Sequence, residues 1–146
     1  MEKNVREDLA IKLLKDIKLY KYFDFIAGAD TFEYRKPDPR HLTNILDILE
    51  IDKKNTIMLG DSETDANTAK AADIHFVLIK DGYTEKNLED IHHDHLIEDF
   101  EVVKDIASNY INLPSYWIDF SKKKTKRHGI LMSISVNQLI IIALNS

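Results

Sequence analysis

The chain has 146 residues, of which 44% are hydrophobic and 31% charged, a balance typical of one folded domain with a sizeable apolar core. A net charge of −5 argues against nucleic-acid binding through overall charge, and the lack of cysteine excludes disulfides, thiolate metal sites and cysteine nucleophiles. The charged N-terminal stretch MEKNVREDLA has no signal-peptide pattern, so we expect a cytoplasmic location.

The first half of the chain predicts a helix, a strand, a rigid loop and a second helix. The 3.6-residue spacing of apolar residues predicts a helix over 5–17, and the stretch YFDFIAGAD predicts a short strand over 25–28. The loop EYRKPDPR follows. Asp38 can cap the next helix, and Pro39 suits its first turn. That helix runs to about Glu50. Its apolar positions are Leu42, Ile45, Leu46 and Leu49, whereas those of the first helix are Val5, Leu9, Leu13, Leu14 and Ile17.

The second half continues the alternation. NTIMLG and HFVLIK predict strands, HLIEDF predicts a short fourth strand, and helices are expected over 63–72 and 101–110. Apolar strands that alternate with helices indicate a parallel sheet covered on both faces. The expected fold class is therefore α/β, a partial doubly wound, Rossmann-like parallel sheet.

Polar residues follow three of these strands. Lys36 comes after the first, Asp61 ends the second, and Asp81 with Gly82 follows the third. Because ligands of such sheets bind at the carboxyl ends of the strands, we expect one shared site at that rim. Carboxylates suit Mg²⁺, and a lysine near a helix N-terminus suits a phosphate.

Simpler interpretations of the same residues remain open at this point. Asp61 and Ser62 could only cap the helix over 63–72, and Asp65 could lie in its solvated first turn. Lys36 could be an exposed loop lysine. Their occurrence together at one predicted rim favours a shared site.

The motifs resemble those of haloacid dehalogenase-type phosphatases, in particular the phosphoglycolate phosphatase-like branch. YKYFDFIAGADTFEYRKPDP is similar to the strand and loop that end in the family's active-site lysine, here Lys36. TIMLGDSETDANTAKAADI is similar to its acidic motif, and LIKDGYT to the loop after the next strand; the resemblance covers about 5–105. It implies that Lys36 steadies the phosphoryl group, that Asp61 binds Mg²⁺, and that Asp65 binds or orients the metal. Gly60 and Ser62 would support the motif.

This sequence has no match to the segments that precede these motifs in the family. The aspartate nucleophile and the acid/base aspartate of a DxDGT-like segment have no counterpart here, and neither does the phosphate-binding Ser/Thr strand or the cap domain. We therefore expect a truncated or split Mg²⁺-dependent phosphatase for a small phosphomonoester such as phosphoglycolate. The chain alone should be inactive, and an N-terminal fragment could complete it. The alternative is a non-enzymatic remnant or partner-binding fragment.

The C-terminal part differs in composition. We expect residues 1–110 to form the core and 111–146 to form a dispensable tail, first basic (SKKKTKRHG) and then apolar (ILMSISVNQLIIIALNS). The apolar run is shorter than the roughly 20 residues of a membrane span, so membrane contact of the tail is not expected. Interfacial attachment, a peripheral strand or helix, and a poorly structured terminus remain alternatives. The histidines of HHDH match no standard metal-site spacing.

Overall fold

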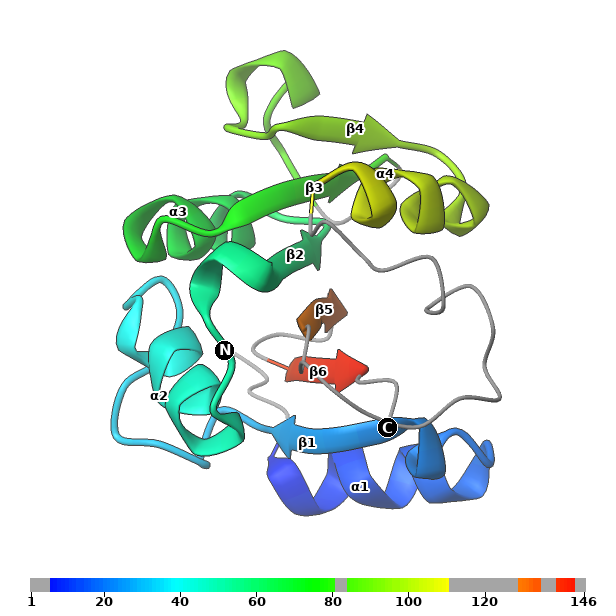
Figure 1. Cartoon of the computed structure of the whole chain (residues 1–146). Helices are drawn as coiled ribbons and strands as arrows, with labels where there is room; N and C mark the ends of the chain where they lie inside the picture. Colours follow the sequence, from blue (N-terminus) through cyan, green and yellow to red (C-terminus); the bar gives the residue numbers. More distant parts are fainter. Residues whose placement is uncertain (1–5, 81–83, 111–128, 135–138, 144–146) are drawn as a thin grey trace.

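The fold is a six-stranded sheet with helices on both faces (Figure 1). The computed structural model describes residues 6–80, 84–110, 129–134 and 139–143. Strand order across the sheet is β1-β6-β5-β2-β3-β4. Strands β5, β2, β3 and β4 are consecutive parallel neighbours, whereas β6 runs antiparallel to both β5 and β1. The predicted α/β class with a partial parallel core is confirmed.

The expected elements of the first hundred residues form close to their predicted bounds. The strands are β1 (Phe23–Ala27), β2 (Thr56–Gly60), β3 (His75–Ile79) and β4 (His95–Ile97). The helices are α1 (Glu7–Asp16), α2 (Arg40–Leu49), α3 (Glu63–Ala72) and α4 (Val103–Tyr110).

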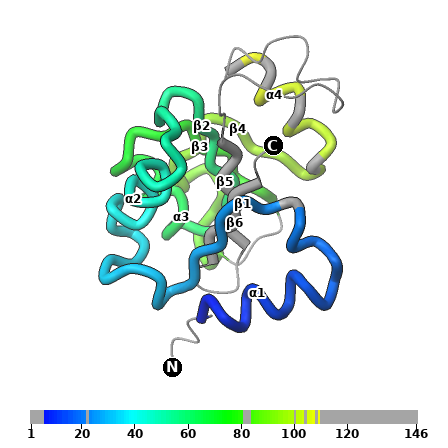
Figure 2. Tube along the Cα trace, turned by 60° about the horizontal axis from the view of Figure 1, so that its bottom comes forward, coloured from blue at the N-terminus to red at the C-terminus, as the bar shows by residue number. Residues whose placement is uncertain are grey.

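Alternation along the strands divides the core between the two faces of the sheet. Met58 of β2 packs on the face that α2 and α3 cover, while its neighbours Ile57 and Leu59 pack with Ala107 of α4 on the other face. Ile26 of β1 packs against α1. Figure 2 shows the same layers, with α2 and α3 on one side of the strands and α1 and α4 on the other.

Helix α1 buries a different face from the one that its apolar residues predict. Ala10 and Leu14 are buried, but Leu9, Leu13 and Ile17 are each more than half exposed. The helix therefore contacts β1 through a narrow strip.

Two strands of the expected tail lie inside the sheet. β5 (Gly129–Ile134) pairs with β2, and β6 (Leu139–Ala143) pairs with β1, so this hairpin occupies the space between the two strands that carry the predicted site (Figure 1). The expectation that this segment lies outside the core does not agree with this pairing. Composition could not show it, because β5 pairs with β2 and β6 pairs with β1, and these partner strands lie roughly 70 to 120 residues earlier in the sequence. Among the described residues, no helix has the length and apolarity needed to cross a bilayer.

The pairing of β5 and β6 yields a stability prediction. Deleting residues 129–146 should remove the inner neighbours of β1 and β2 and leave two unpaired strand edges. We expect the melting temperature, followed by circular dichroism, to fall by roughly 10 °C or more, since each kcal/mol shifts it by about 4 °C in a domain of this size. Deleting only residues 144–146, which belong to no described strand, is the matched control. An unchanged melting temperature in both variants would instead support a dispensable tail.

Candidate functional site

A buried ion pair joins the loop after β1 to the first turn of α3. The Lys36 ammonium Nζ lies 2.7 Å from Asp65 Oδ1, and the two residues are only 6% and 1% exposed. Lys36 follows β1 and Asp65 follows β2, so both lie beyond the carboxyl ends of these strands. The interpretation of Lys36 as an exposed loop lysine, and of Asp65 as a solvated helix residue, is therefore wrong.

Asp65 accepts hydrogen bonds from its own turn as well as from Lys36. Its Oδ2 accepts hydrogen bonds from the Ser62 hydroxyl at 2.8 Å and from the Asp61 backbone N–H at 3.3 Å. Ser62 Oγ in turn accepts from the Asp65 N–H, so the predicted helix cap is confirmed. Gly60 permits this turn, because a Cβ there would lie 2.5 Å from Asp65 Cβ. Asp65 thus fixes the backbone that presents Asp61.

The loop that carries Lys36 is held at both ends. Arg40 Cζ lies 3.5 Å from the centre of the Tyr34 ring. The Tyr34 carbonyl oxygen accepts a 2.7 Å hydrogen bond from His41 Nδ1. Asp38 Oδ1 accepts a hydrogen bond from the Arg40 backbone N–H, as the predicted cap requires. A hydrogen bond from the Arg40 side chain lowers the pKa of Asp38 to about 2. The Lys36–Pro37 peptide bond is cis. These contacts set the position of Lys36 before any ligand binds.

The structure gives His41 a role that the sequence analysis did not predict. The side chain is fully buried in α2, where it packs edge-on against Phe32. Because Nδ1 donates to Tyr34, the neutral ring carries its proton on Nδ1, and burial lowers the pKa of His41 below its usual value. The helical spacing of the sequence could have predicted this burial, since His41 falls on the same helical face as Leu42 and Ile45.

The described residues supply few candidate ligands for a metal ion. No group of three or more His, Asp or Glu side chains in the described part of the chain could hold one, and this includes the HHDH segment. Asp61 is half-buried at the rim, and Asp65 lies beside it. The predicted contributions of Asp81 and Gly82 fall outside the described residues. Strand β5, beside β2, adds no carboxylate, because residues 120–146 contain neither Asp nor Glu.

Comparison with known families and proteins gives a consistent result. Residues 4–79, which are more than half of the chain, match the family model "Haloacid dehalogenase-like hydrolase". The chain is 39% identical over 100 residues to a phosphoglycolate phosphatase of Mesorhizobium japonicum, covering 68% of this chain and 44% of that protein. It is 31% identical over 134 residues to one of Rhodospirillum rubrum, covering 92% of this chain and 51% of that protein. The chain therefore spans about half the length of these relatives.

Solved structures share the fold over a similar part of the chain. A HAD-superfamily hydrolase of Geobacter sulfurreducens aligns with a TM-score of 0.59 and 25% identity, over 69% of this chain and 48% of that one. A predicted phosphoglycolate phosphatase of Haemophilus somnus aligns with a TM-score of 0.62 and 21% identity, over 65% of this chain and 43% of that one. The second match supports the fold only.

The Lys36–Asp65 pair should be energetically coupled. Lys36→Met or Asp65→Asn alone should cost about 3–5 kcal/mol of unfolding free energy, because each leaves a buried charge without its partner. The double variant should cost much less than the sum of the two. Urea unfolding of all four proteins measures this coupling.

The Lys53–Asp73 pair is the matched control for that cycle. Its Nζ–Oδ2 distance is 2.9 Å, but both side chains are exposed, so the cycle with Lys53→Met and Asp73→Asn should give under about 1 kcal/mol. Equal coupling energies for the two pairs would contradict the assignment of Lys36–Asp65 as a structural constraint.

His41 should make stability depend on pH. Its pKa is lowered in the folded state, so the unfolded chain takes up a proton first as the pH falls through about 6.5. The contribution of His41 to stability should therefore be fully present well above that value and be lost progressively as the pH falls from about 7.5 to 5.5. His41→Asn, which keeps a donor for Tyr34 but does not titrate, should reduce the pH slope of the melting temperature in this window, with a remainder from His75, whose pKa burial also lowers. The exposed His92→Gln variant should keep the wild-type slope, and equal slopes for wild type and His41→Asn would count against this account.

Proposed function

Because the chain belongs to the haloacid dehalogenase-like hydrolases, we propose that residues 7–110 supply the lysine and acidic part of a site that hydrolyses a small phosphomonoester in the cytoplasm. The observation that carries this proposal is the buried Lys36–Asp65 contact at the carboxyl rim. At this rim the Lys36 ammonium group offers positive charge to a phosphoryl group, and the aspartates of the turn after β2 offer a ligand to a divalent cation. Phosphoglycolate is the first substrate to test, since the relatives described above are phosphoglycolate phosphatases.

The residues play separate roles in this proposal. Lys36 steadies the charge of the phosphoryl oxygens. Asp65 is a positioning residue, because its two carboxylate oxygens already accept hydrogen bonds from Lys36 and from the turn at 61–62. Gly60 and Ser62 allow that turn to form, as their contacts with Asp65 indicate.

Asp61 fits the ligand role for Mg²⁺ better than Asp65 does. It is half-buried at the rim, whereas Asp65 is closed off from solvent. Mg²⁺ commonly takes one or two protein carboxylates and completes its shell with water and phosphate oxygens, so a single rim aspartate suits it. When bound, the ion would neutralise charge on the phosphate.

The attacking group is not supplied by the described residues at this rim. Covalent phosphoryl transfer needs an in-line nucleophile, and positive charge alone does not replace one. We propose that the chain by itself hydrolyses no phosphomonoester and that a second polypeptide segment brings the nucleophile. One observation favours a non-enzymatic alternative: the β5–β6 hairpin already fills the sheet between β1 and β2.

A complementation assay tests the enzymatic proposal. The full chain is co-expressed with the N-terminal part of the Mesorhizobium japonicum relative that this chain does not match, and phosphoglycolate hydrolysis is measured with and without Mg²⁺. We expect activity only with both pieces. Lys36→Met should lower it by about 10²-fold or more, the scale of losing one preorganised charge contact.

The controls separate the possible causes of failure. Asp61→Asn in the complex should abolish the Mg²⁺ response, while the distant Lys12→Gln should change nothing. Co-purification without activity would support the non-enzymatic alternative. Turnover by the chain alone that is lost in Asp61→Asn would contradict the requirement for a second segment.

A further inference from the structure

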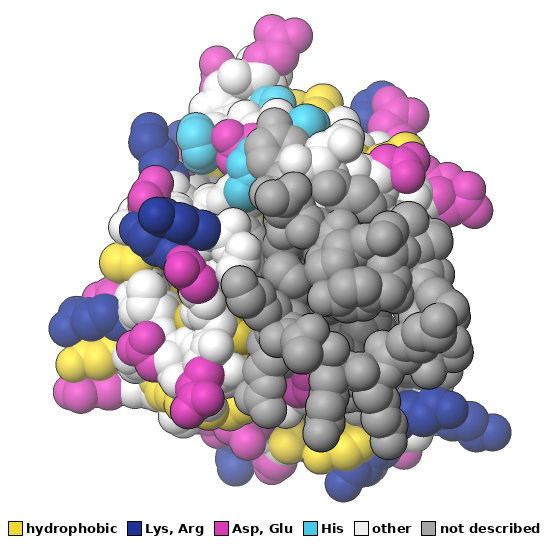
Figure 3. All heavy atoms as spheres, in the orientation of Figure 1, with side chains coloured by type: hydrophobic (Ala, Val, Ile, Leu, Met, Phe, Trp, Pro, Cys, Tyr) yellow, Lys and Arg dark blue, Asp and Glu magenta, His cyan; other side chains and the backbone are white. Residues whose placement is uncertain are grey.

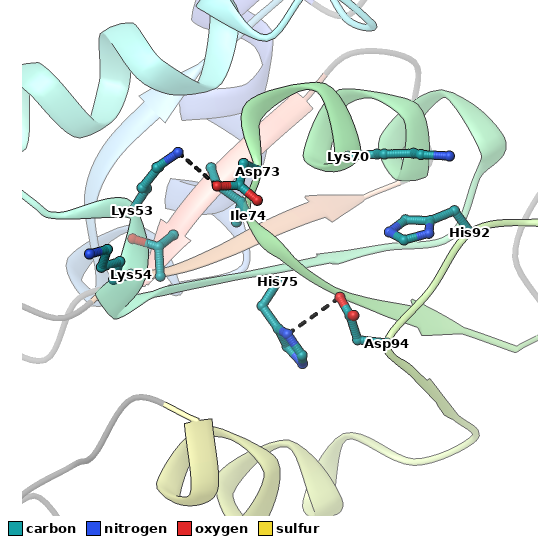
Figure 4. Close-up of a pocket in the computed structure, with 9 residues that line it drawn as sticks. Lys53, Lys54, Lys70, Asp73, Ile74, His75, His92 and Asp94 are labelled. Atoms are coloured by element: carbon teal, nitrogen blue, oxygen red, sulfur yellow. Dashed lines mark hydrogen bonds and ion pairs between the residues drawn. The ribbon is translucent and has the colours of Figure 1, made fainter.

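A pocket lies at the amino ends of the strands, at the opposite end of β2 and β3 from Lys36 and Asp65. Its volume is about 490 Å³, which is within the range of small-molecule sites. Thr56 and His75, the first residues of β2 and β3, form part of its wall. Figure 4 shows His75 there. The residues that matter for its charge are Lys53, Lys54, Lys70, Asp73, His75 and Asp94.

Both aspartates of this pocket already have partners. Asp73 Oδ2 lies 2.9 Å from Lys53 Nζ, and the dashed line in Figure 4 marks this pair. Asp94 Oδ2 accepts a 2.7 Å hydrogen bond from the Phe76 N–H and lies 3.4 Å from His75 Nδ1. The carboxylates are thus engaged in the wall of the pocket.

Three lysines and two aspartates line the pocket, an excess of one positive charge, and Lys53 is already paired with Asp73. Among the described residues, neither Lys54 nor Lys70 forms an ion pair, and both side chains are exposed at the pocket. Figure 4 shows Lys70 and His92 on the same side of it. Burial lowers the pKa of His75, so that ring adds no positive charge at neutral pH. The excess of positive charge contrasts with the net charge of −5 for the whole chain.

The end of α3 does not cancel this charge. A helix C-terminus carries partial negative charge on its last carbonyl groups, which would repel an anion. Here the Asp73 N–H donates to the Lys70 carbonyl, and the Ile74 N–H donates to the Ala69 carbonyl at 2.9 Å. These two carbonyl groups are therefore hydrogen-bonded within the turn, which weakens their repulsion of an anion at the pocket.

We propose that this pocket binds a small polyanion, a molecule with two or more phosphate or carboxylate groups. Lys54 would contact the anionic groups from one side of the pocket, and Lys70, with His92, from the other (Figure 4). Lysine ammonium groups bind such oxygens as mobile point charges with three donors each. Figure 3 shows histidines gathered near lysine or arginine side chains on this side of the molecule. The proposal does not depend on the proposed function.

Ring signals of the histidines test the site directly. The full chain, labelled at histidine, is titrated by NMR with inorganic pyrophosphate and separately with citrate, at constant ionic strength set by KCl. We expect saturable shifts of the His75 and His92 ring signals, while the buried His41 signal stays fixed. Binding of one probe only would identify phosphate or carboxylate as the preferred group.

Paired charge variants make the test specific. Lys54→Gln/Lys70→Gln should weaken binding at least about tenfold, since the double variant removes two charged contacts to the anion. Lys12→Gln/Lys15→Gln on α1 removes the same charge elsewhere and should leave the affinity unchanged. The proposal is overturned if neither probe gives saturable shifts, or if both double variants weaken binding equally.

Discussion

The buried contact between Lys36 and Asp65 constrains the local structure on both sides of it. Two charges that are almost fully removed from water are tolerated only while each keeps its partner. The loop after β1 must therefore hold Lys36 in place, which the contacts of Tyr34 with Arg40 and His41 do. The turn after β2 must admit the Asp65 side chain, which requires a residue without Cβ at Gly60. One ion pair thus explains the residue types of two separate segments.

The centre of the sheet gives the second constraint. β1 and β2 carry the two halves of the candidate site, but they do not pair with each other, because β6 and β5 lie between them. Lys36 nevertheless reaches across to Asp65 beyond the strand ends. The hairpin therefore affects the site indirectly, through the spacing of β1 and β2. Any segment that brings a nucleophile to this rim through the sheet has to compete with that hairpin for the same hydrogen-bonding edges.

Local patterns predicted the parts of the fold that depend on neighbouring residues. Helix α3 forms over the predicted range because Ser62 caps it and its alanines pack closely, and the three main strands follow from short apolar runs. Burial of Lys36 and Asp65 could not be read from either residue alone, since each depends on the other across 29 positions. His41 was not predicted in the core because it is polar, yet a carbonyl partner makes its burial possible. The pairing of β5 with β2 and of β6 with β1 joins segments that are much farther apart in the sequence.

The order of strands also bears on how the protein is synthesised. Residues 129–143 leave the ribosome after the segments that form β1 and β2, yet they provide the inner neighbours of both strands. Until then, the nascent chain presents β2, which is buried along its whole length in the folded protein, with one unpaired edge. High sequence separation slows such pairings and prolongs the exposure of apolar edges. The yield of folded protein in a cell should therefore depend on how quickly translation proceeds beyond residue 110, or on chaperones that cover β2 during that interval.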